Sequence, residues 1–165
     1  MMPAAVRPRA ACAVMATVLL TALLAGAARA DALLDGPEGP IRMVADAVPA
    51  PLTPVPGDPA RGRAVFLDTE RGHCLRCHRV AALEAPFQGT VGPDLSGVGD
   101  RLKPAQLRLR LVDMSVLNPE TVMPPYHRTH DLHEVAEAYR GKPVLAAQDI
   151  EDLIAYLLFL EPSHD

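Results

Sequence analysis

The chain has 165 residues, of which 49% are hydrophobic and only 4% aromatic, and its formal net charge is −4. This acidic balance argues against a nucleic-acid-binding or anionic-lipid-binding protein, because both functions depend on lysine and arginine side chains that neutralise phosphate. So few large aromatic side chains are compatible with a small core that is built partly around a group that is not protein.

The first thirty residues are typical of a cleavable export signal. Two arginines precede an apolar run, residues 10–26, which is shorter than the ~20 residues that a membrane-spanning helix needs. Small residues at Ala28 and Ala30 mark a cleavage site. We therefore predict a signal peptide over residues 1–30, cleaved after Ala30, and no membrane span afterwards. Cleavage would remove three arginines and no acidic residue, changing the formal charge from −4 to −7.

Residues 31–57 contain six prolines and no helical periodicity. This composition predicts an extended, Pro-rich N-terminal tail. A disordered spacer and a strap that becomes ordered on a partner are both compatible with it. A single folded domain is expected to follow, over residues 58–165.

The first and second helices of this domain have recognisable starts. Asp58 followed by Pro59 is typical of a helix N-terminus, and the helix should run to about Glu70 with a glycine on its packed face. The segment LRLRL at residues 107–111 alternates like a strand, but we favour a helix over residues 104–113. Its leucines and the following methionine share one helical face, and proline suits the first turn.

The last helix has the clearest pattern. Apolar residues recur at helical spacing from Ile150 to Leu158, and Pro162 follows. No capping hydroxyl precedes this helix, but acidic residues are concentrated in its first turn, where they complement the helix dipole. With no repeat and no parallel-sheet pattern, the predicted fold class is all-α.

The segment GHCLRCHR at residues 72–79 contains the pattern Cys-x-x-Cys-His. On a helical turn this spacing places Cys74, Cys77 and His78 on the same side, and the pattern is the attachment motif of c-type haem. In this interpretation both cysteines form thioethers to haem and His78 binds the iron. A zinc site would need a second ligand pair, and a redox dithiol would need a βαβ setting; neither pattern is present.

A sixth iron ligand is expected from a methionine. Met123 precedes two prolines in an extended loop, far enough beyond His78 to reach the opposite haem face. Met114 lies on a helix face, where methionine usually fills the core, and Met43 lies in the tail. We favour Met123, with His127 as the main alternative; a His/Met pair would raise the reduction potential.

Five stretches between Gly57 and Leu160 carry a family resemblance: GDPARGRAVF, CLRCH, FQGTVGPDLSGVGDR, LNPETVMPPYHRT and AYRGKPVLAAQDIEDLIAYL. Through them the sequence resembles the SoxX family, the small mono-haem subunits of the periplasmic sulfur-oxidation system. The resemblance implies a class I cytochrome c-like domain around one covalent haem, whose terminal helices cross near Gly62, Phe66 and Tyr156. It also implies that the carbonyl of Pro93 accepts a hydrogen bond from His78.

The same resemblance implies a function. Members of this family pair with a larger cytochrome, SoxA, to form L-cysteine S-thiosulfotransferase in the periplasm, which joins thiosulfate to a cysteine of the carrier SoxYZ and passes electrons to a cytochrome c. That chemistry needs a sulfur nucleophile. Haem would consume Cys74 and Cys77, the cysteines that remain after cleavage, so no catalytic residue is expected on this chain.

Two further functions remain open. The chain could be a free periplasmic electron shuttle, or a haem sensor that binds a gas at an open sixth position. The loop at residues 124–146 contains Tyr126 and Arg128, residue types that are enriched in interface hot spots. We therefore expect this loop and the tail to contact a partner.

Overall fold

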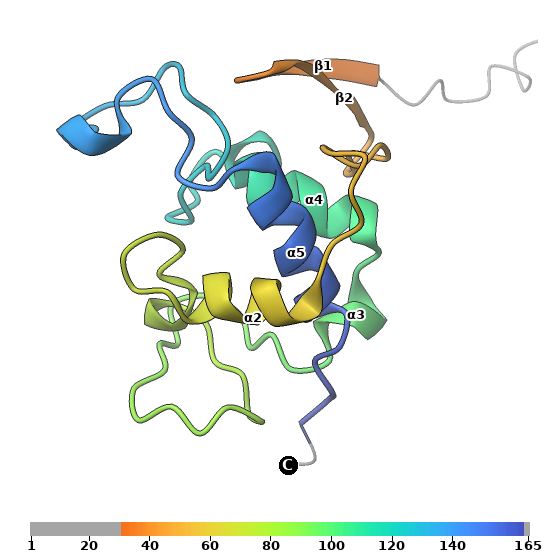
Figure 1. The fold of residues 1–165 in the computed structure, drawn as a ribbon, viewed down its shortest axis with the longest axis vertical. Coiled ribbons are helices and arrows are strands. Elements are labelled where there is room, and N and C mark those ends of the chain that lie inside the picture. The colour runs from red at the N-terminus through yellow and green to blue at the C-terminus, as the bar shows by residue number, and fades with distance from the viewer. Residues whose placement is uncertain (1–30, 164–165) are drawn as a thin grey trace, which may run out of the picture. The chain divides into compact units, whose positions relative to one another are not determined.

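The structure, a computed structural model, describes residues 31–163. The predicted signal peptide over residues 1–30 lies outside the described residues. Within them the elements follow the order β1 (Asp31–Gly36), β2 (Gly39–Val44), α2 (Pro59–Leu67), α3 (Val98–Arg101), α4 (Pro104–Asp113) and α5 (Ala147–Leu157) (Figure 1). Single 3₁₀ turns occur at Cys74–Arg76, Met114–Val116 and Glu137–Tyr139.

The all-α prediction is wrong for residues 31–44, which form an antiparallel hairpin. β1 pairs with β2 in a register that runs from Asp31 opposite Val44 to Gly36 opposite Gly39. The prolines do not prevent this pairing, because Pro37 lies in the turn and a two-stranded sheet has only edge strands, where a proline such as Pro40 is tolerated. The number of prolines alone therefore did not predict the strands in this segment.

The rest of the Pro-rich tail is bound along the helices of its own domain. Val48 is 1% exposed, and its amide donates to the carbonyl oxygen of Ala105 at 2.9 Å. The amide of Leu52 donates to the carboxylate of Glu151 at 2.8 Å. These contacts satisfy backbone groups that would otherwise be left unpaired near the core. The tail thus packs on its own domain, and the chain from Asp31 onward forms one unit.

Helix α2 begins as the sequence predicts and ends three residues early. The side chain of Asp58 accepts a hydrogen bond from the amide of Arg61 at 2.9 Å, and proline occupies the first turn. The helix packs across α5, where the rings of Phe66 and Tyr156 lie 5.4 Å apart between centroids at 57°. The expected crossing of the terminal helices near these residues is confirmed.

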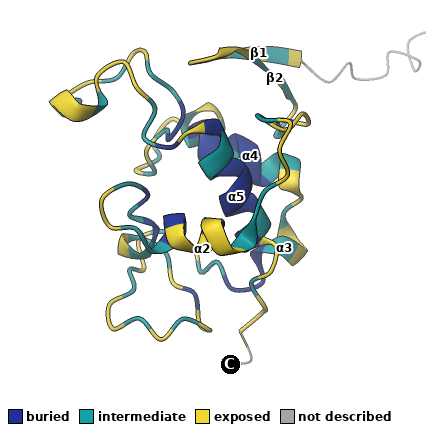
Figure 2. Cartoon of the chain, viewed as in Figure 1, coloured by how far each residue is buried: buried dark blue, intermediate teal, exposed yellow. Residues whose placement is uncertain are grey.

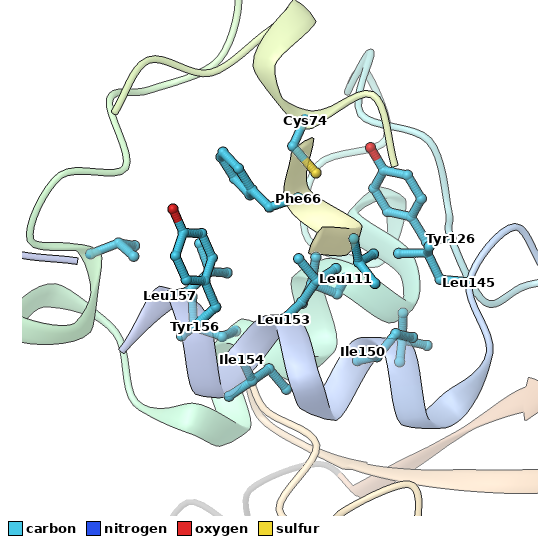
Figure 3. Close-up of a cluster of buried hydrophobic side chains, with 14 of the residues drawn as sticks. Phe66, Cys74, Leu111, Tyr126, Leu145, Ile150, Leu153, Ile154, Tyr156 and Leu157 are labelled. Carbon is cyan, nitrogen blue, oxygen red and sulfur yellow. The ribbon is translucent and has the colours of Figure 1, made fainter. Parts of the chain in front are cut away.

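Helices α4 and α5 form where the sequence predicts them, and their inner faces are buried (Figure 2). The amide of Ala146 donates to the carboxylate of Asp149 at 3.1 Å, so an acidic side chain serves the start of α5 in the absence of a hydroxyl. The buried cluster formed by these helices also contains Cys74 (Figure 3). The core therefore holds one end of the Cys-x-x-Cys-His motif in place.

Candidate functional site

The Cys-x-x-Cys-His motif folds as a tight turn. Cys74 to Arg76 form a 3₁₀ turn, and the amides of Cys77 and His78 both donate to the carbonyl of Cys74, at 3.1 and 2.9 Å. Hydrogen bonds at these two spacings keep the side chains of the motif on one side of the turn. Neither cysteine is part of a disulfide.

A glycine-containing loop lies directly against this turn. The amide of Gly89 donates to the carbonyl of Leu75 and that of Gly92 to the carbonyl of Cys77, each at 2.8 Å. A Cβ on Gly92 would lie against the His78 imidazole, 2.6 Å from Nδ1 and 2.9 Å from Nε2. A side chain at this position would displace the ring. This role of Gly92 was not predicted from the sequence.

The ring of His78 is oriented by a backbone carbonyl. Its Nδ1 lies 2.8 Å from the carbonyl oxygen of Pro93, the contact that the family resemblance implied. A carbonyl acceptor makes Nδ1 the protonated nitrogen and leaves Nε2 as the nitrogen that can bind a metal. Two thiols three residues apart and an oriented imidazole are the donor set that covalent haem requires, so these residues fit that group.

The state of Cys74 argues against a redox dithiol at the same motif. Burial raises the pKa of the Cys74 thiol to about 12. A redox-active cysteine needs the opposite shift, because the thiolate is the attacking species. Geometry and burial therefore favour attachment of a cofactor over dithiol exchange.

The segment that contains Met123 returns to the neighbourhood of the motif. Met123 is partly buried and packs against the cluster that includes Cys74. Its amide donates to the hydroxyl of Thr121 at 3.1 Å. The alternative ligand His127 is 2% exposed, and its Nδ1 lies 3.0 Å from the carbonyl oxygen of Leu145. The ring of His127 thus already joins the loop to the start of α5.

Tyr126 and Arg128, named in the loop that we expect to contact a partner, are both engaged inside the domain; the partner contact itself stays a prediction. Tyr126 is 7% exposed, and its hydroxyl donates to the carbonyl of Gly72 at 2.8 Å. Arg128 donates to the buried carboxylate of Asp113 at 2.9 Å. Both side chains are bound within the domain, and no local signal in the sequence could reveal partners so distant along the chain.

A cavity of about 560 Å³ opens beside the motif. It is lined by residues that include Phe66, Cys74 and the highly exposed Phe87. Neither His78 nor Met123 lines it. The cavity therefore lies on the flank of the motif and is not the space between the two expected iron ligands.

Comparisons with known proteins agree with this site. Residues 59–161 match the family described as cytochrome c. A chain of the crystal structure of SoxXA from P. pantotrophus is similar, with 34% sequence identity and a TM-score of 0.69; the match covers 76% of this chain and 97% of that one. No curated protein matches the chain.

Proposed function

Because the chain belongs to the cytochrome c family and is a SoxX-type cytochrome, we propose that it is the mono-haem electron-transfer subunit of a periplasmic thiosulfate-oxidising complex. The larger haem subunit, of SoxA type, is the partner and carries the catalytic sulfur chemistry. This chain accepts electrons from that subunit while thiosulfate is joined to a cysteine of the SoxYZ carrier. It then delivers them to a cytochrome c.

One observation carries the proposal: the Cys-x-x-Cys-His turn is built with its histidine already oriented. Cys74 and Cys77 provide two thiols for haem attachment, and the carbonyl of Pro93 holds Nδ1 of His78 so that Nε2 is available to iron. Met123 would supply the second iron ligand. The haem contributes one-electron redox chemistry, and the His/Met pair favours a potential suited to accepting electrons.

In this proposal the chain has no catalytic role, because of its thiols. The cysteines in the described part of the chain are Cys74 and Cys77, and haem attachment would use both. A thiosulfate-conjugating enzyme needs a free sulfur nucleophile, which must then come from the partner. A signal peptide over residues 1–30 would direct the chain to the periplasm. No helix in residues 31–163 is long and apolar enough to span a membrane.

Native mass spectrometry of the tagged protein, purified gently from the periplasm of its host, tests this function. We expect a chain that begins at Asp31, carries one covalent haem and is bound to a second cytochrome. The double variant Cys74→Ser/Cys77→Ser is the control, and it should lose the covalent haem. A haem-loaded chain found only alone would favour a free electron shuttle, and a wild-type chain without haem would refute the proposal.

A further inference from the structure

Tyr126 makes hydrogen bonds through its amide, its carbonyl and its hydroxyl. Its amide donates to the carbonyl of Leu111 in α4 at 3.3 Å, and its own carbonyl accepts from the amide of Leu145, just before α5, at 3.0 Å. Its hydroxyl donates to the carbonyl of Gly72 at 2.8 Å, two residues before the first cysteine of the motif. Figure 3 shows Tyr126 and Cys74 at the same end of the buried cluster. One residue thus joins two helices to the segment that leads into the motif.

The phenol is suited to act as a permanent donor. Burial raises the pKa of the Tyr126 hydroxyl well above its ordinary value. The proton therefore stays on the oxygen throughout the physiological pH range, and the hydrogen bond to Gly72 is not lost by titration. Gly72 is buried. Without the Tyr126 hydroxyl, its carbonyl would lose this hydrogen-bond donor, which is costly for a buried group.

The connection between Tyr126 and Met123 is short and stiff. Pro124 and Pro125 alone separate the two residues, and each proline ring fixes its φ near −65°. The residue before a proline is also restricted to extended conformations, which applies to Met123 itself. With so few free dihedral angles in this segment, a displacement of Tyr126 is transmitted to Met123 and is not absorbed between them.

We propose that Tyr126 is a positioning residue for the sixth iron ligand: its hydrogen bond to Gly72 ties the loop that carries Met123 to the segment that carries the attachment motif. This inference rests on the proposed haem ligation by Met123. The bond links the loop that holds Met123 to the segment that leads into the attachment motif, between residues that are 54 positions apart in the sequence. With haem bound, it would hold Met123 in place as an iron ligand and so limit binding of outside ligands.

The chain contains a matched control. Tyr139 makes the same kind of bond, from its hydroxyl to the carbonyl of Glu70 at 2.8 Å, in the same loop and to the same segment before the motif. Tyr139 is partly exposed, however, and lies sixteen residues beyond Met123 with many rotatable bonds between them. Loss of its hydroxyl should therefore leave the iron ligand undisturbed.

The test compares haem-loaded wild type with Tyr126→Phe and Tyr139→Phe. The methionine-to-iron charge-transfer band of the ferric protein reports ligation, and the rate of carbon monoxide binding to the ferrous protein reports how often the loop opens. For Tyr126→Phe we expect a weakened band that is lost at lower temperature, and a carbon monoxide rate roughly tenfold faster, the factor that one buried hydrogen bond supplies. Met123→Ala defines the fully open site, and Tyr139→Phe should behave as wild type.

Three outcomes would overturn the inference. Equal bands and equal carbon monoxide rates in Tyr126→Phe and wild type would show that the hydroxyl does not hold the ligand. Equal effects in both tyrosine variants would show only general loosening of the loop. A wild-type protein that lacks the band would remove the premise of Met123 ligation, and native mass spectrometry would still judge the proposed function separately.

A measurement on the wild type alone also tests the inference, and it is independent of whether the variants fold. Mild denaturant should abolish the charge-transfer band at the concentration at which the amides of Tyr126 and Leu145 lose protection from hydrogen exchange. If the band disappears while these amides stay protected, Met123 moves independently of Tyr126 and the inference is wrong.

Discussion

At the scale of single residues, the charge pair between Arg108 and Glu151 shows how the tail is held. Both side chains are more than nine-tenths buried, at 5% and 7% exposure. Arg108 donates to the two carboxylate oxygens at 2.7 and 2.8 Å and to the carbonyl of Val48 at 2.8 Å. The same carboxylate accepts from the amide of Leu52. The pair therefore connects α4, α5 and the Pro-rich segment.

Replacing Arg108 by methionine should destabilise the fold strongly. Arg108→Met leaves a buried carboxylate without its cation, which lowers the free energy of unfolding by about 3–5 kcal/mol. Urea unfolding would measure this as a lower midpoint at unchanged slope. The control is Arg42→Met, because Arg42 pairs with Asp31 at 2.6 Å on the surface, where such pairs contribute about 0–1 kcal/mol. Equal losses in the two variants would contradict the burial argument.

At the scale of elements, the crossing of α2 and α5 depends on the absence of a side chain at Gly62. A Cβ there would lie against the carbonyl oxygen of Asp152 and 2.9 Å from the Cβ of Tyr156. The backbone of α5 fills this space, so neither neighbour is a flexible side-chain end. The close approach brings the rings of Phe66 and Tyr156 together beside the attachment motif.

Gly62→Ala should destabilise the protein although it raises helix propensity. Propensity alone predicts a gain of about 1 kcal/mol, whereas forcing a methyl group into the crossing costs about 1–3 kcal/mol. The reverse change Ala64→Gly, on the exposed side of the same helix, should lose only the propensity contribution. Thermal unfolding of both variants measures the two effects. A higher melting temperature for Gly62→Ala would show that the helices do not touch there.

The elements also show where local patterns suffice. Helix α4 has the predicted bounds, Pro104 to Asp113, because proline and the leucine spacing act within the helix itself. The hairpin of β1 and β2 was missed, because its strands gain stability from pairing with each other and from Leu34 and Ile41, which pack on the core. The residue pattern of a single segment shows neither the pairing between strands nor the packing on the core.

At the scale of the whole molecule, the ionisation of Asp152 makes the stability of the fold depend on pH. Burial alone would raise its pKa, but hydrogen bonds from Arg61, the amide of Asp58 and Gln148 together hold the pKa below its ordinary value of 3.8. Arg61 donates to its two oxygens at 2.6 and 2.8 Å. A lowered pKa in the folded state means that the unfolded state binds the proton more readily.

Stability should therefore fall as the pH drops below about 4, the range in which unfolded aspartates take up protons. The contribution of Asp152 is fully present above that range and is lost as the pH falls through its folded pKa. In urea unfolding, Arg61→Gln should be less stable than wild type at neutral pH, and the difference should shrink at pH ~3. Arg63→Gln, an exposed residue of the same helix, controls for the change in net charge. A difference that is constant with pH would refute this linkage.

The sequence by itself determined the three main helices and identified the Cys-x-x-Cys-His motif on which the proposed haem attachment rests. Their signals are local: a spacing of three residues between cysteines, a histidine next to the second, and apolar residues at helical intervals. The cytochrome c family match agrees with this part of the analysis.

Only the tertiary structure decided which contacts the tail and the loop at residues 124–146 make. Tyr126 finds its acceptor 54 positions away and Arg108 its carboxylate 43 positions away, so neither role is visible in its own segment. A polar residue placed in a loop is expected at the surface unless the fold brings a partner to it. Burial and hydrogen bonding are properties of the assembled chain, because the free energy of a buried polar group depends on the partner that the fold supplies.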